Sequence, residues 1–293
     1  MPLVSVVIPT HNRPEMLAEA IASVRAQTFT DYEIIVVSNG ESDDMRRASR
    51  KVAAAHDSAY FELDDGNVCF ARNTGVERAN GEWIAFLDDD DLWLANKLER
   101  QVAEARRTGA DLIACDYVKF FPDGREITER PRVRDGWSYV KALSHQYWWA
   151  PPSATMVRKR VLDEIGGFDP QQLYSEDTDV WRRISWRHTI HQTDEVLVRY
   201  RQGHGSLMQH ERRLYLYDLR HYFKMRRDTP HHLRSALPPA ATFLAPRLVG
   251  ILAPDWLLRH LHRLRPRTRW IQFRQWLRPR TWWGHLRQGS RFK

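Results

Sequence analysis

The chain has 293 residues, of which 42% are hydrophobic and 28% are charged. This composition supports a large folded core and excludes a disordered or collagen-like chain. The net charge of +8 is unevenly placed: residues 207–293 hold 19 of the 45 Lys and Arg but only 4 of the 37 Asp and Glu, a balance of +15 against −7 for residues 1–206. An acidic body therefore carries a basic C-terminal region.

Several classes of protein are excluded by simple features of the chain. Two cysteines cannot make a disulfide framework or a cysteine-only metal site, so a reducing compartment is the simplest expectation. No secretory leader is expected, because the apolar stretch 3–8 has no basic residue before it and ends at Pro9. The best candidate for a membrane span, residues 236–258, contains four prolines together with Arg247 and Asp255, so we expect a soluble or membrane-surface protein.

The first third of the chain alternates between two hydrophobic periods. Short apolar runs typical of strands buried on both faces occupy residues 4–8, 33–37 and 83–87. Apolar residues at helical spacing occupy residues 15–27 and 45–56 and, more briefly, 73–79. This order predicts a Rossmann-like α/β fold, in which a mainly parallel sheet is flanked by helices.

Polar segments follow each of these three predicted strands, at residues 9–13, 38–40 and 88–91. Because the carboxyl ends of parallel strands meet at one edge of a sheet, these segments are expected to lie together and to bind a ligand there. The first strand is followed neither by a Gly-x-Gly-x-x-Gly turn nor by a Walker lysine loop. A dinucleotide-dependent enzyme and a P-loop ATPase are therefore disfavoured.

Residues 88–91 are four consecutive aspartates directly after a buried strand. Their mutual repulsion is unfavourable unless water or a cation screens it. A solvated acidic loop is the simplest interpretation, whereas a site for a hard divalent cation is the functional one, since Mg²⁺ and Mn²⁺ prefer carboxylate oxygens and leave positions open for phosphates. The location at the carboxyl end of a strand favours the cation site.

Five segments in order resemble the family 2 glycosyltransferases, which have a GT-A fold. These are SVVIPTHNR (5–13), ARNTG (71–75), GEWIAFLDDDD (81–91), GGFD (166–169) and EDTDVW (176–181). The resemblance covers residues 3–206 and implies a catalytic domain at 1–206. The basic region at 207–293, which we expect to be mostly helical, lies outside it. The resemblance also implies transfer of a sugar from a nucleotide-diphosphate donor with inversion at the anomeric carbon.

The resemblance implies roles for the matching residues on the donor side. Asp90 is the expected direct ligand of Mn²⁺ or Mg²⁺, with Asp88 near the metal or the ribose, because a cation that bridges the phosphates stabilises the leaving group. His204, after the last expected strand of the domain, is expected at the metal or the diphosphate. The residues expected to bind the nucleotide are Pro9, Thr10, Asn12, Arg13, Asn39, Arg72, Asn73, Asp88 and Asp89.

Simpler structural roles stay open for some of these residues. Thr10 and Asn12 are also ordinary turn residues after a strand. Arg72 is suited to phosphate or base oxygens, but it could equally form a structural ion pair with an aspartate of the run. Asp91 either joins the site or caps a helix that begins near residue 92.

The segment after the second strand departs from the family pattern of two aspartates, glycine and serine. This chain has Ser38, Asn39, Gly40 and Glu41 instead. Asn39 can still accept a base N–H through its side-chain carbonyl. A UDP-sugar is therefore the favoured donor, while thymidine and guanosine donors stay open.

On the acceptor side, the resemblance implies that Asp177 is the catalytic base, because an inverting displacement needs one carboxylate to deprotonate the acceptor hydroxyl. Glu176 is expected to orient Asp177 or to touch the acceptor. Asp179 competes for the role of base, but it better fits a first-turn acid on a helix dipole. The expected acceptor-binding residues are Trp148, Trp149 and Ser153, with a core-filling role as the alternative for the two tryptophans.

The basic region interleaves Trp and Leu with Arg over residues 256–283. Interfacial helices use this combination, because aromatic rings settle at the headgroup level while guanidinium groups meet lipid phosphates. We therefore expect peripheral attachment to the inner, cytoplasmic face of the cell membrane and no nucleic-acid partner. Two alternatives are binding of single-stranded nucleic acid and a helical subdomain packed on the catalytic body.

The favoured interpretation of the whole chain is a metal-dependent inverting glycosyltransferase. Its expected partners are a nucleotide-sugar, a glycan or polyprenyl-diphosphate-linked acceptor and an anionic membrane surface, in the assembly of a surface polysaccharide or glycoconjugate. The alternatives are a non-catalytic nucleotide-sugar or glycan-binding module and a nucleic-acid-binding protein. The presence of both Asp90 and Asp177 argues against the non-catalytic module.

Overall fold

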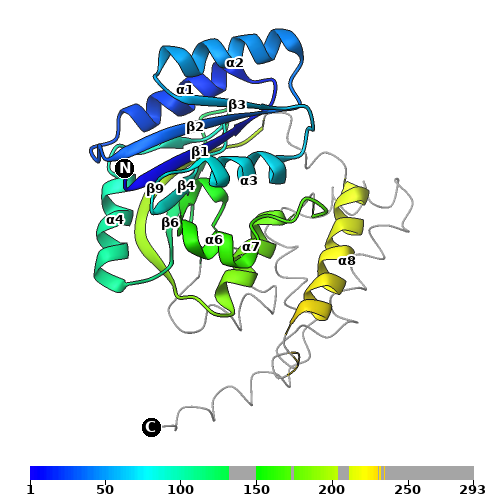
Figure 1. The fold of residues 1–293 in the computed structure, drawn as a ribbon. Coiled ribbons are helices and arrows are strands. Elements are labelled where there is room, and N and C mark those ends of the chain that lie inside the picture. Colours follow the sequence, from blue (N-terminus) through cyan, green and yellow to red (C-terminus); the bar gives the residue numbers. More distant parts are fainter. Residues whose placement is uncertain (132–149, 173–174, 204–210, 230, 232–233, 235–293) are drawn as a thin grey trace. The chain divides into compact units, whose positions relative to one another are not determined.

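The computed structural model describes residues 1–131, 150–172, 175–203, 211–229, 231 and 234 (Figure 1). The chain divides into two compact units, Met1–Leu207 and Met208–Lys293, one residue away from the expected boundary. In the second unit, residues Glu211–Asp228 form the α-helix α8. Trp148, Trp149, His204 and residues 256–283 lie outside the described residues, so the expectations placed on them stay predictions.

The described residues form one nine-stranded sheet in the order β3-β2-β1-β4-β8-β6-β9-β5, with β7 paired to β6. The first half is parallel and consists of β1 (Val4–Thr10), β2 (Tyr32–Asn39), β3 (Ala59–Leu63) and β4 (Trp83–Phe86). The second half mixes directions and consists of β5 (Leu92–Trp93), β6 (Leu112–Phe120), β7 (Glu126–Glu129), β8 (Thr155–Arg158) and β9 (Ile190–Arg201). The predicted α/β fold with a mainly parallel sheet at the site is confirmed.

Helices cover both faces of the parallel half. In Figure 1, α1 (Pro14–Arg25) and α2 (Asp43–Ala55) lie on one side of β1–β3, and α3 (Val68–Arg78) lies on the other. Helix α4 (Lys97–Thr108) packs against β6 and β9, and α6 (Lys159–Ile165) packs against α7 (Glu176–Ser185). A 3₁₀ turn, η1 (Pro152–Ala154), precedes β8. Because both faces are covered, every residue of β1 and β4 is buried, as the unbroken apolar runs predict.

Three element predictions need correction. Strand β3 was not predicted: it lies at the sheet edge, none of its residues is fully buried, and its apolar run of three residues, 59–61, is interrupted by Glu62. Helix α3 begins at Val68 rather than near residue 73, capped by Asn67, whose side chain accepts a hydrogen bond from the Cys69 N–H. The helix expected near residue 92 is wrong, since Leu92 lies in β5 and α4 begins at Lys97.

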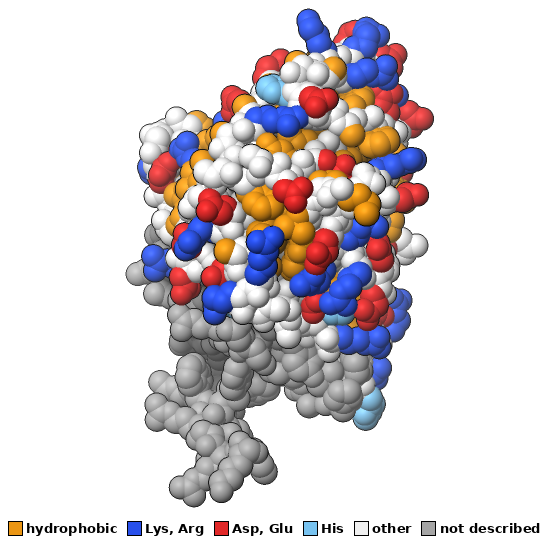
Figure 2. Space-filling model, turned by 60° about the vertical axis from the view of Figure 1, so that its left-hand side comes forward, with side chains coloured by type: hydrophobic (Ala, Val, Ile, Leu, Met, Phe, Trp, Pro, Cys, Tyr) orange, Lys and Arg blue, Asp and Glu red, His pale blue; other side chains and the backbone are white. Residues whose placement is uncertain are grey.

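The surface of the first unit mixes charges of both signs. Figure 2 shows Lys and Arg interspersed with Asp and Glu on the face drawn. Several surface charges of the unit form ion pairs, such as Arg100–Glu195 at 2.5 Å. Both cysteines are buried and unbridged. Among the residues that the structure describes, no helix has the length and apolar character needed to cross a bilayer.

Helix α3 comes unusually close to β1 at Gly75. A methyl group added there would lie inside van der Waals contact with Val7 Cγ1 and 3.0 Å from Val7 Cγ2, and Val7 is completely buried. Glycine is therefore the residue that lets α3 lie against the strand whose carboxyl end enters the site.

We predict that Gly75→Ala lowers the free energy of unfolding by about 1–3 kcal/mol, because overpacking a close-packed core forces side-chain and backbone shifts. This loss should exceed the gain of up to about 1 kcal/mol in helix propensity. Urea denaturation measures the difference, with Glu77→Ala on the exposed face of α3 as the control. An increase in stability for Gly75→Ala would contradict the close contact.

Candidate active site

The aspartate run splits into an accessible pair and a buried pair. The side chains of Asp88 and Asp90 are 24% and 19% exposed, whereas Asp89 and Asp91 are buried. A hydrogen bond from the Asp91 N–H to the Asp88 carbonyl oxygen at 3.1 Å closes the run into a turn. Two carboxylates are thus available to a ligand, and two serve the protein itself.

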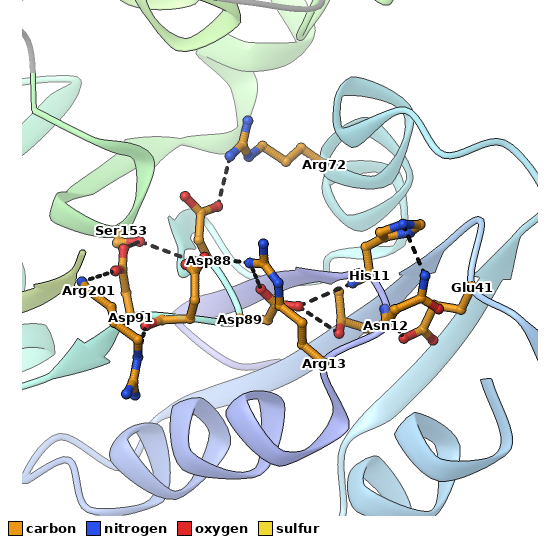
Figure 3. Close-up of polar contacts among 12 residues, drawn as sticks. His11, Asn12, Arg13, Glu41, Arg72, Asp88, Asp89, Asp91, Ser153 and Arg201 are labelled. Atoms are coloured by element: carbon orange, nitrogen blue, oxygen red, sulfur yellow. Dashed lines mark hydrogen bonds and ion pairs between the residues drawn. The ribbon is translucent and has the colours of Figure 1, made fainter. Parts of the chain in front are cut away.

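Asp89 connects the aspartate run, residues 88–91, to the loop after β1 through hydrogen bonds. Its carboxylate accepts hydrogen bonds from the Thr10 hydroxyl at 2.9 Å and the His11 N–H at 3.1 Å, and Arg13 lies at 3.3 Å (Figure 3). Burial, together with the charge of Asp90, raises the pKa of Asp89 to about 7. Asp89 and Thr10 were both predicted to contact the nucleotide, and in the structure their side chains are hydrogen-bonded to each other.

Asp91 holds the opposite end of the turn. Its carboxylate accepts hydrogen bonds from the Ser153 hydroxyl at 2.6 Å and the Arg201 N–H at 2.9 Å (Figure 3). Burial, with the charges of Asp90 and Asp88, raises the pKa of Asp91 well above its usual value. The expected helix-capping role of Asp91 is wrong, because the chain continues into β5 rather than into a helix.

Ser153 was expected to contact the acceptor, and the structure corrects this. Its side chain is completely buried, donates to Asp91 and accepts from the Asp88 N–H at 3.0 Å. Such a hydroxyl presents no surface to a sugar. Arg201 was not predicted for the site, yet its Nε donates to the Asp90 carbonyl oxygen at 2.8 Å.

Two arginines lie against the accessible carboxylates. Arg13 pairs with Asp90 at 2.5 Å, and the buried Arg72 donates to Asp88 and to Glu176, each at 2.8 Å. Burial alone would lower the pKa of Arg72, but the two carboxylates outweigh it and raise the pKa. The structural ion pair considered for Arg72 is confirmed, and it joins the aspartate run to α7.

Hydrogen bonds join the loops that follow β1 and β2 at the edge of the sheet. Pro9 lies opposite Val37 in the β1–β2 register, and the Asn12 N–H donates to the Glu41 carboxylate at 2.8 Å. The buried Glu41 also accepts hydrogen bonds from the hydroxyls of Ser38 and Ser49. In the sequence, this contact is indicated only by the position of Glu41, two residues after the end of β2.

Asn39 stands out within these loops. It is 5% exposed, and its Oδ1 is buried without a hydrogen-bond partner among the described residues. Its main-chain carbonyl accepts a hydrogen bond from the His11 ring at 2.6 Å. An orphaned buried acceptor is costly unless a ligand supplies the donor.

Glu176 and Asp177 are the first two residues of α7. The Asp177 carboxylate accepts a hydrogen bond from the Thr178 N–H at 2.6 Å. Burial by the surrounding chain, and next the charge of Glu176, raise the pKa of Asp177 to about 7. A carboxylate with this pKa suits proton transfer near neutral pH.

Asp179 lies in the first turn of α7 as expected, but its surroundings are those of a core residue. It is completely buried and pairs with Arg182 at 2.6 Å and Arg183 at 2.9 Å. This pairing gives Asp179 a structural role.

Asn73 lies beside the GGFD segment and not beside the loops after β1 and β2. Its amide nitrogen donates to the Phe168 carbonyl oxygen, and its Oδ1 accepts from the Phe168 N–H, both at 2.8 Å. The side chain thus serves the chain's own loop in place of the predicted nucleotide contact.

The pair Asp88 and Asp90 fits a hard divalent cation in its chemistry. Both are partly exposed carboxylates, and Mg²⁺-type sites often use one or two carboxylates together with substrate phosphates. Within the described part of the chain, no cluster of three or more His, Cys, Asp or Glu side chains forms a protein-only metal site.

Comparison with known proteins agrees with the residue pattern. A family model described as Glycosyl transferase family 2 matches residues 5–211. Glycosyltransferase AglE of Haloferax volcanii is 31% identical over 188 residues, covering 62% of this chain and 61% of the relative. The uncharacterized glycosyltransferase EpsJ of Bacillus subtilis is 31% identical over 226 residues, covering 71% and 63%. The chain thus spans less than two thirds of the length of these curated relatives.

Solved structures show the same fold. A mannosyltransferase from Pyrobaculum calidifontis, in complex with GDP-Man and Mn²⁺, superposes with a TM-score of 0.63 at 18% identity, covering 94% of this chain and 85% of that one. TarS of S. aureus, residues 1–349 in complex with UDP-GlcNAc, gives a TM-score of 0.62 at 17% identity, covering 85% and 72%. The predicted GT-A fold is confirmed.

The family model spans more than half of the chain and includes all five segments that suggested the resemblance. The edge that these segments form carries the accessible aspartate pair, the orphaned Asn39 acceptor and the raised-pKa carboxylate of Asp177. The chain belongs to glycosyl transferase family 2.

Proposed function

We propose that the protein is a divalent-cation-dependent inverting glycosyltransferase that moves a sugar from a nucleotide-diphosphate donor to an acceptor hydroxyl. The observation that carries this proposal is the ion-pair bridge from Asp88 through Arg72 to Glu176. This bridge connects Asp88, a proposed cation ligand, to Glu176, the neighbour of Asp177. The groups proposed to bind the donor and to activate the acceptor therefore lie at the same edge of the sheet.

The donor is proposed to be a UDP-sugar, with thymidine and guanosine diphosphate sugars as alternatives. Asn39 supports a nucleobase at this edge, because its buried Oδ1 needs an N–H donor and uracil, thymine and guanine each carry one. Two of these three bases occur in the ligands of the structural neighbours, which are UDP-GlcNAc and GDP-Man. A hexosyl or N-acetylhexosaminyl group is the class of sugar proposed.

Asp88 and Asp90 are the residues that would hold Mn²⁺ or Mg²⁺. When bound, such a cation neutralises the charge that builds on the diphosphate as the glycosidic bond breaks. Arg13 and Arg72 already lie against these two carboxylates and add positive charge beside the proposed leaving group.

Asp177 is proposed to act as general base. As the acceptor oxygen attacks the anomeric carbon, its proton passes to the Asp177 carboxylate, while the bond from that carbon to the phosphate oxygen breaks and the nucleoside diphosphate leaves. A base with a pKa near 7 is half ionised at neutral pH and can accept that proton. Glu176 supports it by holding the Arg72 bridge at the start of α7.

We further propose a glycan or polyprenyl-diphosphate-linked acceptor, presented at the inner face of the cell membrane during assembly of a surface polysaccharide or glycoconjugate. The support is the +15 charge balance of residues 207–293, which opposes the −7 of residues 1–206. Charge of this sign draws the C-terminal region to anionic lipids, with about 1 kcal/mol for each basic residue near the surface.

Removal of the proposed metal ligand tests the cation requirement. We predict that Asp90→Asn lowers sugar transfer at least about a hundredfold while the fold is kept, because a bound cation supplies several kcal/mol of charge stabilisation. A donor panel with Mn²⁺ or Mg²⁺ is assayed by release of each nucleoside diphosphate, with Asp123→Asn on an exposed turn as control. Full wild-type activity in excess chelator would rule out the cation-dependent mechanism.

Replacing the proposed base tests the proton transfer. We predict that Asp177→Asn lowers turnover by about 10²–10⁴-fold with little change in donor affinity, because general-base catalysis contributes that much. In the wild type, turnover should rise with pH through about 7 and then level off, since the base works only when deprotonated.

The matched control is Asp194→Asn, an exposed carboxylate on β9. The assignment fails if Asp177→Asn abolishes donor binding but keeps turnover. Donor binding without turnover by the wild type, for every donor and acceptor tried, would instead indicate a non-catalytic binding module.

Membrane attachment is tested with the full-length chain. We predict co-sedimentation with anionic vesicles that is lost in high salt and is weakened by replacing Trp270, Trp276, Trp282 and Trp283 with alanine, because aromatic rings supply the interfacial contact. Neutral vesicles are the control. Tighter salt-sensitive binding to an oligonucleotide than to anionic vesicles would favour a nucleic-acid partner.

A further inference from the structure

The loop before α7 has no regular structure of its own over residues 166–172, although it leads to the catalytic carboxylates. Such a loop takes its position from whatever it is bonded to. Side chains of α3 and of its cap, in the middle of the chain, hydrogen-bond to this segment, and Arg183 of α7 donates to the Gly167 carbonyl oxygen at 2.6 Å.

Four positions on or next to α3 hold this segment. The Asn67 amide donates to the Pro170 carbonyl oxygen at 2.9 Å, and the Cys69 thiol donates to the Gln172 carbonyl oxygen at 3.6 Å. Asn73 exchanges two hydrogen bonds with the backbone of Phe168, and Arg72 donates to Glu176 in the first turn of α7. Helix α3 and its cap therefore hold several points of the described part of the approach to α7.

Phe168 packs against the two elements that carry the aspartate run and Asp177. It is buried, and its ring lies edge-on to Phe86 at 5.3 Å between centroids and to Trp181 at 6.3 Å. Phe86 ends β4, two residues before Asp88, and Trp181 lies in α7, four residues after Asp177. The ring is thus packed between the element that ends at the aspartate run and the helix that carries the base.

We infer that Asn73 is a positioning residue for the reaction: its two hydrogen bonds to Phe168 set where Asp177 lies relative to the aspartate run. We call these two hydrogen bonds the Asn73–Phe168 clasp. This inference rests on the proposed function for its catalytic consequence, whereas the clasp itself is a property of the fold. Asn73 reaches the reacting atoms only through Phe168 and α7.

Two adjacent glycines offer a matched test. Gly166 and Gly167 both have left-handed backbones, with φ of +75° and +64°, so an alanine at either position carries the same kind of strain. A methyl group at Gly167 would lie 2.5 Å from Asn73 Oδ1, whereas one at Gly166 meets no atom within 4 Å. Of these two substitutions, only the one at Gly167 is therefore expected to disturb the hydrogen bonds of the Asn73–Phe168 clasp.

The experiment compares Gly167→Ala, Gly166→Ala, Asn73→Ala and the double variant Asn73→Ala with Gly167→Ala in the full chain. Amide hydrogen exchange is followed in residues 166–172 and in the first turn of α7. Loss of the clasp should speed exchange in both segments at least about tenfold, because the Phe168 N–H loses its acceptor and its neighbours open locally. Gly166→Ala should leave the first turn of α7 unchanged.

Turnover and nucleotide affinity are measured on the same variants, with UDP or GDP and Mn²⁺ as the binding probes. Gly167→Ala and Asn73→Ala should each lower kcat by about 10- to 100-fold, as small misplacements of reacting groups do, with dissociation constants for the nucleotide unchanged within about twofold. The double variant should be no slower than Asn73→Ala alone, because the methyl group then has no amide to displace.

Distinct outcomes overturn the two parts. Wild-type exchange rates in Asn73→Ala would show that there is no clasp. Faster exchange with an unchanged kcat, or equal losses of kcat in Gly166→Ala and Gly167→Ala, would refute the positioning role. If no donor is turned over by the wild type, the proposed function fails, and the exchange comparison alone then decides whether Asn73 positions α7.

Discussion

Four carboxylates at the end of one buried strand repel one another, and the rest of the site is arranged around their neutralisation. Two arginines form ion pairs with the run, Arg13 on the first loop and Arg72 on α3, and a third, Arg201 at the end of β9, donates to the Asp90 carbonyl oxygen. Each comes from a different element, so the four segments must converge at this edge. The fold and the charge balance of the site are thus one constraint, since losing the ion pair of Arg13 or of Arg72 leaves carboxylates uncompensated.

The arginine on α3 does more than neutralise. Arg72 binds Asp88 with one nitrogen and Glu176 with another, while its guanidinium carbon lies 5.3 Å from the centre of the Phe168 ring. Gly75 lets the same helix lie against β1, and Asn73 holds the loop before α7. Helix α3 therefore connects the aspartate run, strand β1 and the loop before α7, so that groups far apart in sequence keep a fixed relation.

Much of this arrangement follows from local sequence rules, and the remainder depends on tertiary contacts. Apolar runs predicted β1, β2 and β4, because strands buried on both faces need them; the edge strand β3 needs none and was missed. Family motifs located the aspartate run but not the partners of its members. Which carboxylates reach the surface, and why Ser153 and Asn73 turn inward, depends on segments more than 60 residues away.

We propose that the accessible carboxylates Asp88 and Asp90 form a cation-dependent nucleotide site beside the turn that carries Asp177. Crystals grown with Mn²⁺ and UDP or GDP test it most directly, by anomalous scattering from the metal. If the proposal holds, a peak lies within direct coordination distance of a carboxylate oxygen of Asp90 or Asp88 and of an oxygen of the diphosphate. A nucleotide bound at this edge without a metal peak beside these two residues would contradict it.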